Sequence, residues 1–223
     1  MGTLYIVATP IGNLKDLTFR ALETLKTADV VYAEDTRVTK KLFSHYGVTV
    51  PLRRYDEHSH TRALGEIIGA LASGKSVALV TDAGTPGIAD PGNRLVEAIR
   101  RTLPKVDVVP IPGPSALVTA LSVAGIPAEH FTFFGYPPQK KGREKFFKEI
   151  GMCGVRPVVL YESPHRVVKT LEAIRKTFGD AHELFVAREL TKVYEELWSG
   201  STAEAVAHFT GDHLRGEFVI IIR

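Results

Sequence analysis

Short apolar runs, each followed by turn residues and then by an amphipathic stretch, are the feature that most restricts the fold of this sequence. The first four runs are almost entirely apolar, as in strands buried on both faces, and we expect strands at residues 4–8, 30–33, 77–81 and 106–110. Apolar residues at helical spacing predict helices over residues 16–26, 61–72 and 93–101. This alternation predicts βαβ units, and therefore an α/β fold with a mostly parallel amino-terminal sheet.

The pattern changes after the stiff turn Ile111-Pro112-Gly113-Pro114. A helical stretch follows over residues 115–124, and a short helix is expected at 202–209. Further strands are expected at 131–134, 157–161, 183–187, 196–199 and 217–222. Their closer spacing favours a mixed sheet with antiparallel pairs. We therefore predict two domains, an amino-terminal α/β domain at 1–112 and a carboxy-terminal α/β domain with a mixed sheet at 113–223.

Composition excludes several classes of protein. The 223 residues are 44% hydrophobic and 24% charged, an ordinary globular balance that excludes fibrous and disordered chains. The longest apolar runs are far shorter than the roughly 20 residues of a membrane-spanning helix. The single Cys153 excludes an intramolecular disulfide and a cysteine-based metal site. With no recognisable secretory signal, we expect a cytoplasmic protein that does not bind membranes.

Loops after the predicted strands are the candidate ligand sites, because open α/β sheets bind ligands at the carboxyl ends of their strands. The loop at 9–13 lacks the glycine spacing of a dinucleotide site, and it also fits a plain strand–helix turn. The loop at 82–92 is eleven residues long, which is too long for a simple connection, and it holds three Gly, two Pro and two Asp. It favours a ligand loop, although Asp90 also suits a helix cap.

Two further loops carry polar residues at strand ends. The segment 112–116 has small residues that leave room for a flat ligand, and Ser115 also suits an N-cap. The segment 161–166 concentrates charged and aromatic residues, although Ser163-Pro164 is also a typical helix start.

Acid–base and metal chemistry each have candidates. Glu34, Asp35 and Arg37 follow the strand at 30–33 and suit catalysis as well as helix capping with a surface ion pair. His58 and His60 are close together but have no third ligand nearby in the sequence, so we expect no metal site.

Basic residues gather between residues 137 and 148, where Lys140, Lys141 and Arg143 stand at the start of the segment. A net charge of +3 neither requires nor excludes a polyanionic partner. The segment is either a solvated linker or a lip that contacts phosphates.

Together these segments resemble the tetrapyrrole methylase superfamily. Within it they resemble the branch that methylates the 2′-hydroxyl of a cytidine in 16S rRNA of the small ribosomal subunit. The matching segments, in family order, are 9–14, 34–37, 82–92, 112–116, 161–166, 188–192 and 216–217. The resemblance implies a fold with S-adenosyl-L-methionine bound in a cleft between two domains, and usually a homodimer. This fold differs from the common Rossmann-like methyltransferases, which agrees with the missing glycine fingerprint.

The resemblance also implies roles for individual residues. The cofactor contacts it implies are Pro10, Asp82, Gly84, Thr85, Ile88, Ser115, Ala116, Tyr161, Ala187 and Glu217. We expect Glu34, Asp35 and Arg37 to act in catalysis, because a ribose hydroxyl is a poor nucleophile and benefits from a base. The residues expected to bind the RNA substrate are Lys140, Lys141, Arg143, Arg166 and Lys192. The alternatives are a methylase for a corrin or porphyrin, and an RNA-binding module without enzymatic activity.

Overall fold

The computed structural model describes residues 1–57 and 59–223, and the chain forms two compact units, Met1–Ser115 and Ala116–Arg223. The first unit ends at Ser115, whereas the predicted amino-terminal domain ends at residue 112. Within the described residues, no helix combines the length and the apolar character needed to cross a bilayer.

The first unit is built on a five-stranded parallel sheet in the order β3-β2-β4-β1-β5, which confirms the predicted α/β class. Its strands are β1 (Thr3–Val7), β2 (Val30–Ala33), β3 (Leu52–Arg54), β4 (Val77–Val80) and β5 (Asp107–Ile111). Its helices are η1 (Leu14–Asp16), α1 (Phe19–Thr27), α2 (Thr36–Tyr46), α3 (His60–Ala72) and α4 (Gly92–Thr102).

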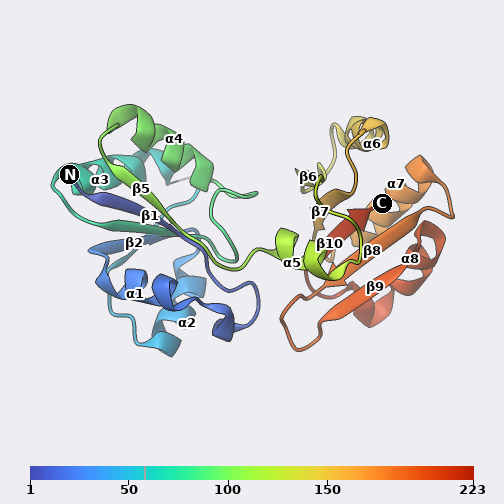
Figure 1. The fold of residues 1–223 in the computed structure, drawn as a ribbon, viewed down its shortest axis with the longest axis horizontal. Helices are drawn as coiled ribbons and strands as arrows, with labels where there is room; N and C mark the ends of the chain where they lie inside the picture. Colours follow the sequence, from blue (N-terminus) through green and yellow to red (C-terminus); the bar gives the residue numbers. More distant parts are fainter. Residues whose placement is uncertain (58) are drawn as a thin grey trace. The chain divides into compact units, whose positions relative to one another are not determined.

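Helices cover both faces of this sheet, α1 and α2 on one side and α3 and α4 on the other (Figure 1). Successive strand residues point to opposite faces, so Val31 packs with α1 and α2 whereas Val30 and Tyr32 pack with α3 and α4. Both faces are therefore buried, and this is why the strands are apolar throughout rather than alternating.

The second unit contains the mixed sheet that the sequence predicted, in the order β6-β7-β10-β8-β9. The pair β6–β7 is parallel, and the other three neighbouring pairs are antiparallel. Its strands are β6 (Thr132–Gly135), β7 (Val158–Glu162), β8 (Glu183–Arg188), β9 (Glu196–Ser201) and β10 (Phe218–Ile222). Its helices are α5 (Ala116–Val123), α6 (Arg143–Met152), α7 (Val167–Phe178), α8 (Thr202–His208) and η2 (Gly211–Leu214).

One face of the mixed sheet packs against α6, α7 and α8, as Figure 1 shows for the second unit. Leu160, Val186 and Ile220 lie on that face and are fully buried with Leu171 of α7. Helix α5 lies against β10.

Several boundaries differ from the prediction for local reasons. The helix expected from residue 16 begins at Phe19, because Thr18 accepts a hydrogen bond from the Ala21 amide and caps it there. Strand β3 was not predicted, since it has only three residues and two of them, Arg53 and Arg54, are exposed. A charged side chain on a short edge strand protects the sheet from unwanted pairing.

Candidate active site

The loops after β1 and β4 meet at the topological switch point of the parallel sheet. Strand β1 is followed by a helix on one face of the sheet, and its neighbour β4 is followed by a helix on the other face. Ligands of open α/β sheets bind at such a point, beyond the carboxyl ends of the strands. Here the loops are joined by a two-residue bridge, in which the amides of Thr9 and Gly84 donate to each other's carbonyls at 2.9 and 3.1 Å.

Side-chain hydrogen bonds connect the ends of three strands at this point. The Thr9 hydroxyl donates to the Thr81 carbonyl at 3.1 Å, and the Thr81 hydroxyl donates to Oε2 of Glu34 at 3.0 Å. The Asp35 amide donates to Oδ1 of Asp82 at 2.9 Å. The structure therefore brings together Glu34, Asp35 and Asp82, which lie far apart in the sequence.

The two neighbouring acids Glu34 and Asp35 differ in their electrostatic surroundings. Partial burial raises the pKa of Glu34, and the nearby carboxylates of Asp82 and Asp90 raise it further, against the hydrogen bond from Thr81. The guanidinium of Arg37 donates to both oxygens of Asp35 and holds the pKa of Asp35 at about 2. Glu34 is therefore the better proton acceptor near neutral pH, whereas Asp35 stays ionised and occupied by Arg37.

Asp35 also performs the structural role that the sequence left open. Its side chain accepts from the Arg37 amide at 2.8 Å and caps α2. The Arg37 side chain is almost fully exposed, so its ion pair contributes little to stability.

Asp90 holds the loop at 82–92 in a tight conformation. Its Oδ1 accepts from the amides of Gly87 and Gly92 at 2.8 and 2.7 Å, which joins the loop to the first turn of α4. A Cβ on Gly92 would lie 2.8 Å from the Gly87 nitrogen and 2.9 Å from Asp90 Oδ1, so only glycine fits there. The expected helix cap by Asp90 is wrong, because the N-cap residue of α4 is Pro91 and makes no side-chain cap hydrogen bond. Asp90 instead fixes the shape of the loop.

A cavity of about 580 Å³ lies beside this loop and is lined by Glu34. Its other lining residues are Asp56, Glu57, Gly87, Ala89, Asp90, Pro91, Asn93 and Arg94. Four carboxylates against one guanidinium make this wall acidic, which suits a ligand that presents hydroxyl or ammonium donors.

Six of the ten cofactor residues implied by the resemblance belong to the first unit, namely Pro10, Asp82, Gly84, Thr85, Ile88 and Ser115. The Thr85 hydroxyl donates to the Pro114 carbonyl at 3.2 Å and thereby joins the loop at 82–92 to the segment before Ser115. Ile88 presents an exposed apolar side chain, and Pro10 follows the bridge residue Thr9 directly.

The remaining predicted cofactor residues belong to the second unit. Tyr161 of β7 and Ala187 of β8 both pair with Val219 of β10, so the three share one face of the mixed sheet. The Tyr161 hydroxyl accepts from the Leu117 amide at 2.9 Å, in the first turn of α5, which begins at Ala116.

Glu217 lies just before β10, and the residue that precedes it, Gly216, must be glycine. Gly216 has φ +97°, and a Cβ there would lie 2.2 Å from the Glu189 side chain. Glu189 Oε1 accepts from the Glu217 amide at 3.0 Å. Lys192 donates to Glu189 at 2.6 Å and to Glu217 at 3.0 Å, so its ammonium is already paired with two carboxylates.

The predicted RNA-contacting loop is only partly exposed. Lys140 and Lys141 are exposed, as expected. Arg143 is 9% exposed, and the expectation that it faces RNA is wrong. Its guanidinium donates to the Pro138 carbonyl at 3.2 Å and to the Thr170 hydroxyl at 2.6 Å, so it anchors the loop to α7 instead.

A buried acid that the sequence analysis did not single out holds Arg166. Glu162 is 1% exposed, and its Oε1 lies 2.7 Å from the Arg166 guanidinium, while Oε2 accepts from Thr170 at 2.6 Å. Arg166 also donates to the Pro137 carbonyl at 3.0 Å, so it too helps to hold the loop that carries the exposed lysines. The signal in the sequence was the spacing of Glu162 and Arg166, four residues apart.

Of the histidine pair considered for a metal, the structure describes His60 alone. His58 lies outside the described residues. His60 begins α3, and its Nδ1 is 2.8 Å from the Tyr55 hydroxyl.

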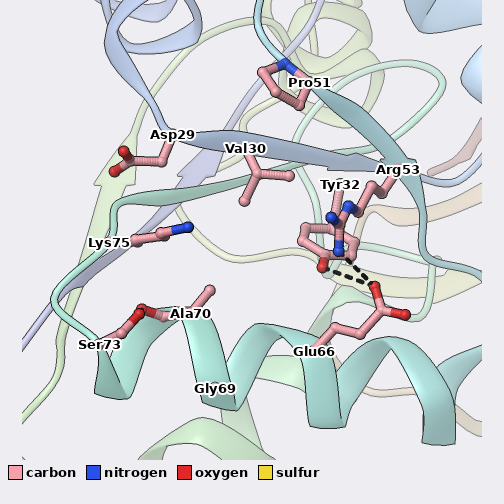
Figure 2. Close-up of a pocket in the computed structure, with 10 residues that line it drawn as sticks. All are labelled: Asp29, Val30, Tyr32, Pro51, Arg53, Glu66, Gly69, Ala70, Ser73 and Lys75. Carbon is pink, nitrogen blue, oxygen red and sulfur yellow. Dashed lines mark hydrogen bonds and ion pairs between the residues drawn. The ribbon is translucent and has the colours of Figure 1, made fainter.

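A second cavity of the first unit has a volume of about 470 Å³ and is lined by residues of β2, β3 and α3 (Figure 2). Asp29, Pro51 and Lys75 in its wall precede strands rather than follow them. Glu66 of α3 fills one side by accepting from Tyr32 at 3.3 Å and Arg53 at 2.9 Å. Because its wall includes the amino ends of strands, we do not include this cavity in the candidate site.

Comparisons with known proteins agree on one family. The family model described as tetrapyrrole (corrin/porphyrin) methylases matches residues 3–206. Proteins named ribosomal RNA small subunit methyltransferase I from Synechocystis sp. and Thermotoga maritima are 44% and 43% identical to the whole chain, which covers 79% and 98% of their lengths. The protein of that name from Bacillus subtilis is 44% identical over 222 residues and 75% of its length.

Solved structures share the fold at low sequence identity. A uroporphyrin-III-C-methyltransferase from Thermus thermophilus matches with a TM-score of 0.70 at 20% identity, over 100% of this chain and 94% of that one. The methyltransferase CobJ matches with a TM-score of 0.74 at 18% identity, over 100% and 95%. At these identities the likeness establishes the fold alone.

Proposed function

Because the chain belongs to the tetrapyrrole methylase family and is therefore a methyltransferase, we propose that it methylates RNA of the small ribosomal subunit. The observation that carries this proposal is the identity of 43–46% to proteins named for that activity, over almost the whole of this chain. The finer proposal is transfer to the 2′-hydroxyl of a cytidine in the decoding region of 16S rRNA. A homodimer in the cytoplasm is part of the same proposal.

The proposed methyl donor is S-adenosyl-L-methionine, whose sulfonium supplies an electrophilic methyl group when it is bound. One observation in the first unit supports this choice of methyl donor. Asp82 binds the Asp35 amide through Oδ1 and remains exposed, so its carboxylate can also accept from a hydroxyl or an ammonium group. The predicted contacts fall into two groups: Pro10, Asp82, Gly84, Thr85, Ile88 and Ser115 in the first unit, and Ala116, Tyr161, Ala187 and Glu217 in the second.

Glu34 is the proposed general base for the ribose hydroxyl. It combines a raised pKa with a place on the wall of the acidic cavity, and Thr81 orients its carboxylate. Asp35 and Arg37 are proposed to position the RNA and each other, since each already satisfies the charge of the other. The sequence alone did not separate these two acids.

The roles of the two acids are tested by comparing Glu34→Gln with Asp35→Asn. We expect Glu34→Gln to lower kcat by about 10²–10⁴-fold and to remove the acidic limb of its pH profile. Asp35→Asn should keep that limb, because an acid with a pKa of about 2 is ionised throughout the working range. Loss of the limb in Asp35→Asn, or its survival in Glu34→Gln, would reverse the assignment.

Lys140 and Lys141 are proposed to contact RNA phosphates outside the chemical centre. They are exposed on a loop that Arg143 and Arg166 hold through the Pro138 and Pro137 carbonyls. Changing both lysines to alanine should weaken RNA binding and lower the slope of its salt dependence by about 1 for each lysine.

The matched control for this pair is Lys26→Ala with Lys105→Ala, which removes the same charge from exposed positions of the first unit. Equal loss of RNA affinity in both double variants would mean that net charge, and not this loop, binds RNA. S-adenosyl-L-methionine affinity should be unchanged in both.

The whole proposal is tested by methyl transfer from labelled S-adenosyl-L-methionine to isolated small ribosomal subunits, with mapping of the labelled nucleotide. Label on one cytidine ribose supports it. Label only on an added corrin or porphyrin would identify a small-molecule methylase, and RNA binding without cofactor binding would identify a module without enzymatic activity.

A further inference from the structure

Three potential metal ligands of the second unit converge at a place remote in sequence from the proposed catalytic acids. Glu196 begins β9, His208 ends α8 and His213 lies in η2. One ligand atom from each, namely one carboxylate oxygen and two imidazole nitrogens, lies within 4.8 Å of the others. Nε2 of His208 is 2.5 Å from Glu196 Oε1, and Nδ1 of His213 is 3.0 Å from Oε2.

Neighbouring groups orient these three side chains. Arg188 donates from Nε to Glu196 Oε2 at 2.7 Å, and its own position is set by a second donation to the Arg215 carbonyl at 2.9 Å. The His208 ring stacks on Trp198, with centroids 5.5 Å apart and planes at 21°. Such supporting contacts are what fixes the orientation of ligands in metal sites.

We propose that Glu196, His208 and His213 bind one divalent transition-metal ion of the zinc class. Two imidazole nitrogens and one carboxylate oxygen form a donor set that zinc commonly takes, with a fourth position left for water. The spacing of His208 and His213 also falls within the range seen for histidine pairs in zinc sites. This proposal does not depend on the methyltransferase proposal.

The rearrangement that binding requires is small. At metal–ligand distances of roughly 2.0–2.2 Å, tetrahedral ligand atoms lie about 3.3–3.5 Å apart. With Oε1 of Glu196 as the shared ligand, the contact of His208 must open from 2.5 Å by somewhat under about 1 Å, and that of His213, at 3.2 Å, changes little. The two imidazole nitrogens, which lie within 4.8 Å of each other, must reach the same spacing of about 3.3–3.5 Å. Each imidazole moves its proton to its other nitrogen and offers a lone pair to the ion.

A cavity beside His208 leaves room for its contact with Glu196 to lengthen. The ring lines a cavity of about 410 Å³ with Trp198, Ser199, Glu204 and Ala207. The positive charge of Arg188 opposes the bound cation, but Arg188 contacts the carboxylate rather than either histidine. It therefore limits the affinity without blocking the imidazole ligands.

The test is titration of the untagged, EDTA-treated chain with Zn²⁺ against a competing chromophoric chelator, and with Co²⁺ followed by its visible absorption. We expect one equivalent to bind and Co²⁺ to give the intense bands of a tetrahedral site. His213→Ala and His208→Ala should each lower the affinity by at least about 100-fold. His130→Ala removes an exposed histidine of the same unit and should change nothing.

A thermal melt separates a metal site from a merely structural cluster. Zn²⁺ should raise the melting temperature of the parent chain and of His130→Ala, but not of His213→Ala, whose side chain is exposed enough to be removed without a cavity. If Zn²⁺ binding is absent, or is equally tight in the His208 and His213 variants, the three residues form only a hydrogen-bonded cluster and the proposal is wrong.

Discussion

Replacing Glu162 by glutamine removes the buried negative charge that holds Arg166 and, through Thr170, Arg143 in the second unit. The carboxylate is 1% exposed and has three partners: the Arg166 guanidinium at 2.7 Å, the Ser163 amide at 2.7 Å and the Thr170 hydroxyl at 2.6 Å. Thr170 in turn accepts from Arg143. Two arginines are therefore held, directly or through one hydroxyl, by a single buried acid.

The size of the effect follows from what remains after the change. Glutamine keeps one acceptor oxygen, but its amide nitrogen would face donors, and the Arg166 charge would lose its partner. Removing one member of a buried ion pair costs about 3–5 kcal/mol. Because Arg166 keeps some access to water, we expect the lower end, about 3 kcal/mol. At about 4–8 °C per kcal/mol for a unit of this size, the melting temperature should fall by at least about 12 °C.

The assay uses the only tryptophan of the chain, Trp198, which lies in the second unit and reports its unfolding in urea or on heating. Glu149→Gln is the matched control, because it removes an exposed acid of the same unit whose partner Lys145 is 3.7 Å away. The control should change the free energy of unfolding by less than about 0.5 kcal/mol. A Glu162→Gln effect below about 1 kcal/mol, or one equal to that of the control, would refute the reasoning from buried charge.

Three further predictions concern other parts of the chain. Gly92→Ala should weaken S-adenosyl-L-methionine binding about tenfold or more, because the added Cβ would clash with Asp90 and Gly87. The affinity is measured by calorimetry, and an unchanged affinity would mean that this loop is not part of the cofactor site. Ile67→Ala should lower the stability of the first unit by about 2–5 kcal/mol, since the side chain is fully buried. Urea unfolding followed by circular dichroism measures the loss, and a smaller loss would mean that the core closes around the cavity. Partial burial raises the pKa of Glu196, but hydrogen bonds from two histidines and Arg188 outweigh it and lower the pKa to about 2. This stabilisation is present above the ordinary pKa of 4.5 and is lost as pH falls toward 2, so in EDTA the second unit should become less stable over that window. Glu196→Gln should flatten this pH dependence.

Local sequence signals predicted nine of the ten strands found in the described residues, but not the helices α2, α6 and α7. The strand at Val30–Ala33 has the predicted bounds, and the predicted β4 and β8 differ from the observed strands by one residue at one end. Alternation of such strands with amphipathic helices predicted the parallel sheet, and closer spacing predicted the mixed one. These features succeed because helical and strand periodicity are properties of neighbouring residues.

The sequence predicted which segments form the candidate site, but not the role of each residue in it. The loop at 82–92 was identified by its length and its glycines, and the structure places it on the switch point beside Thr9. The sequence did not distinguish Glu34 from Asp35, because the difference lies in Arg37 and in burial. Arg143 was assigned to RNA from its basic neighbours, whereas its packing under the loop buries it.

The sequence by itself determined that this chain forms α/β units, where its polar loops stand, and, through its family motifs, that it is a methyltransferase. Only the tertiary structure decided that β4 enters between β2 and β1, and this order brings the loops after β1 and β4 together. Only the tertiary structure joins Glu196 to two histidines and Glu162 to its arginines. The physical reason is that strand order, burial and pKa depend on contacts between residues distant in the chain, which local periodicity does not encode.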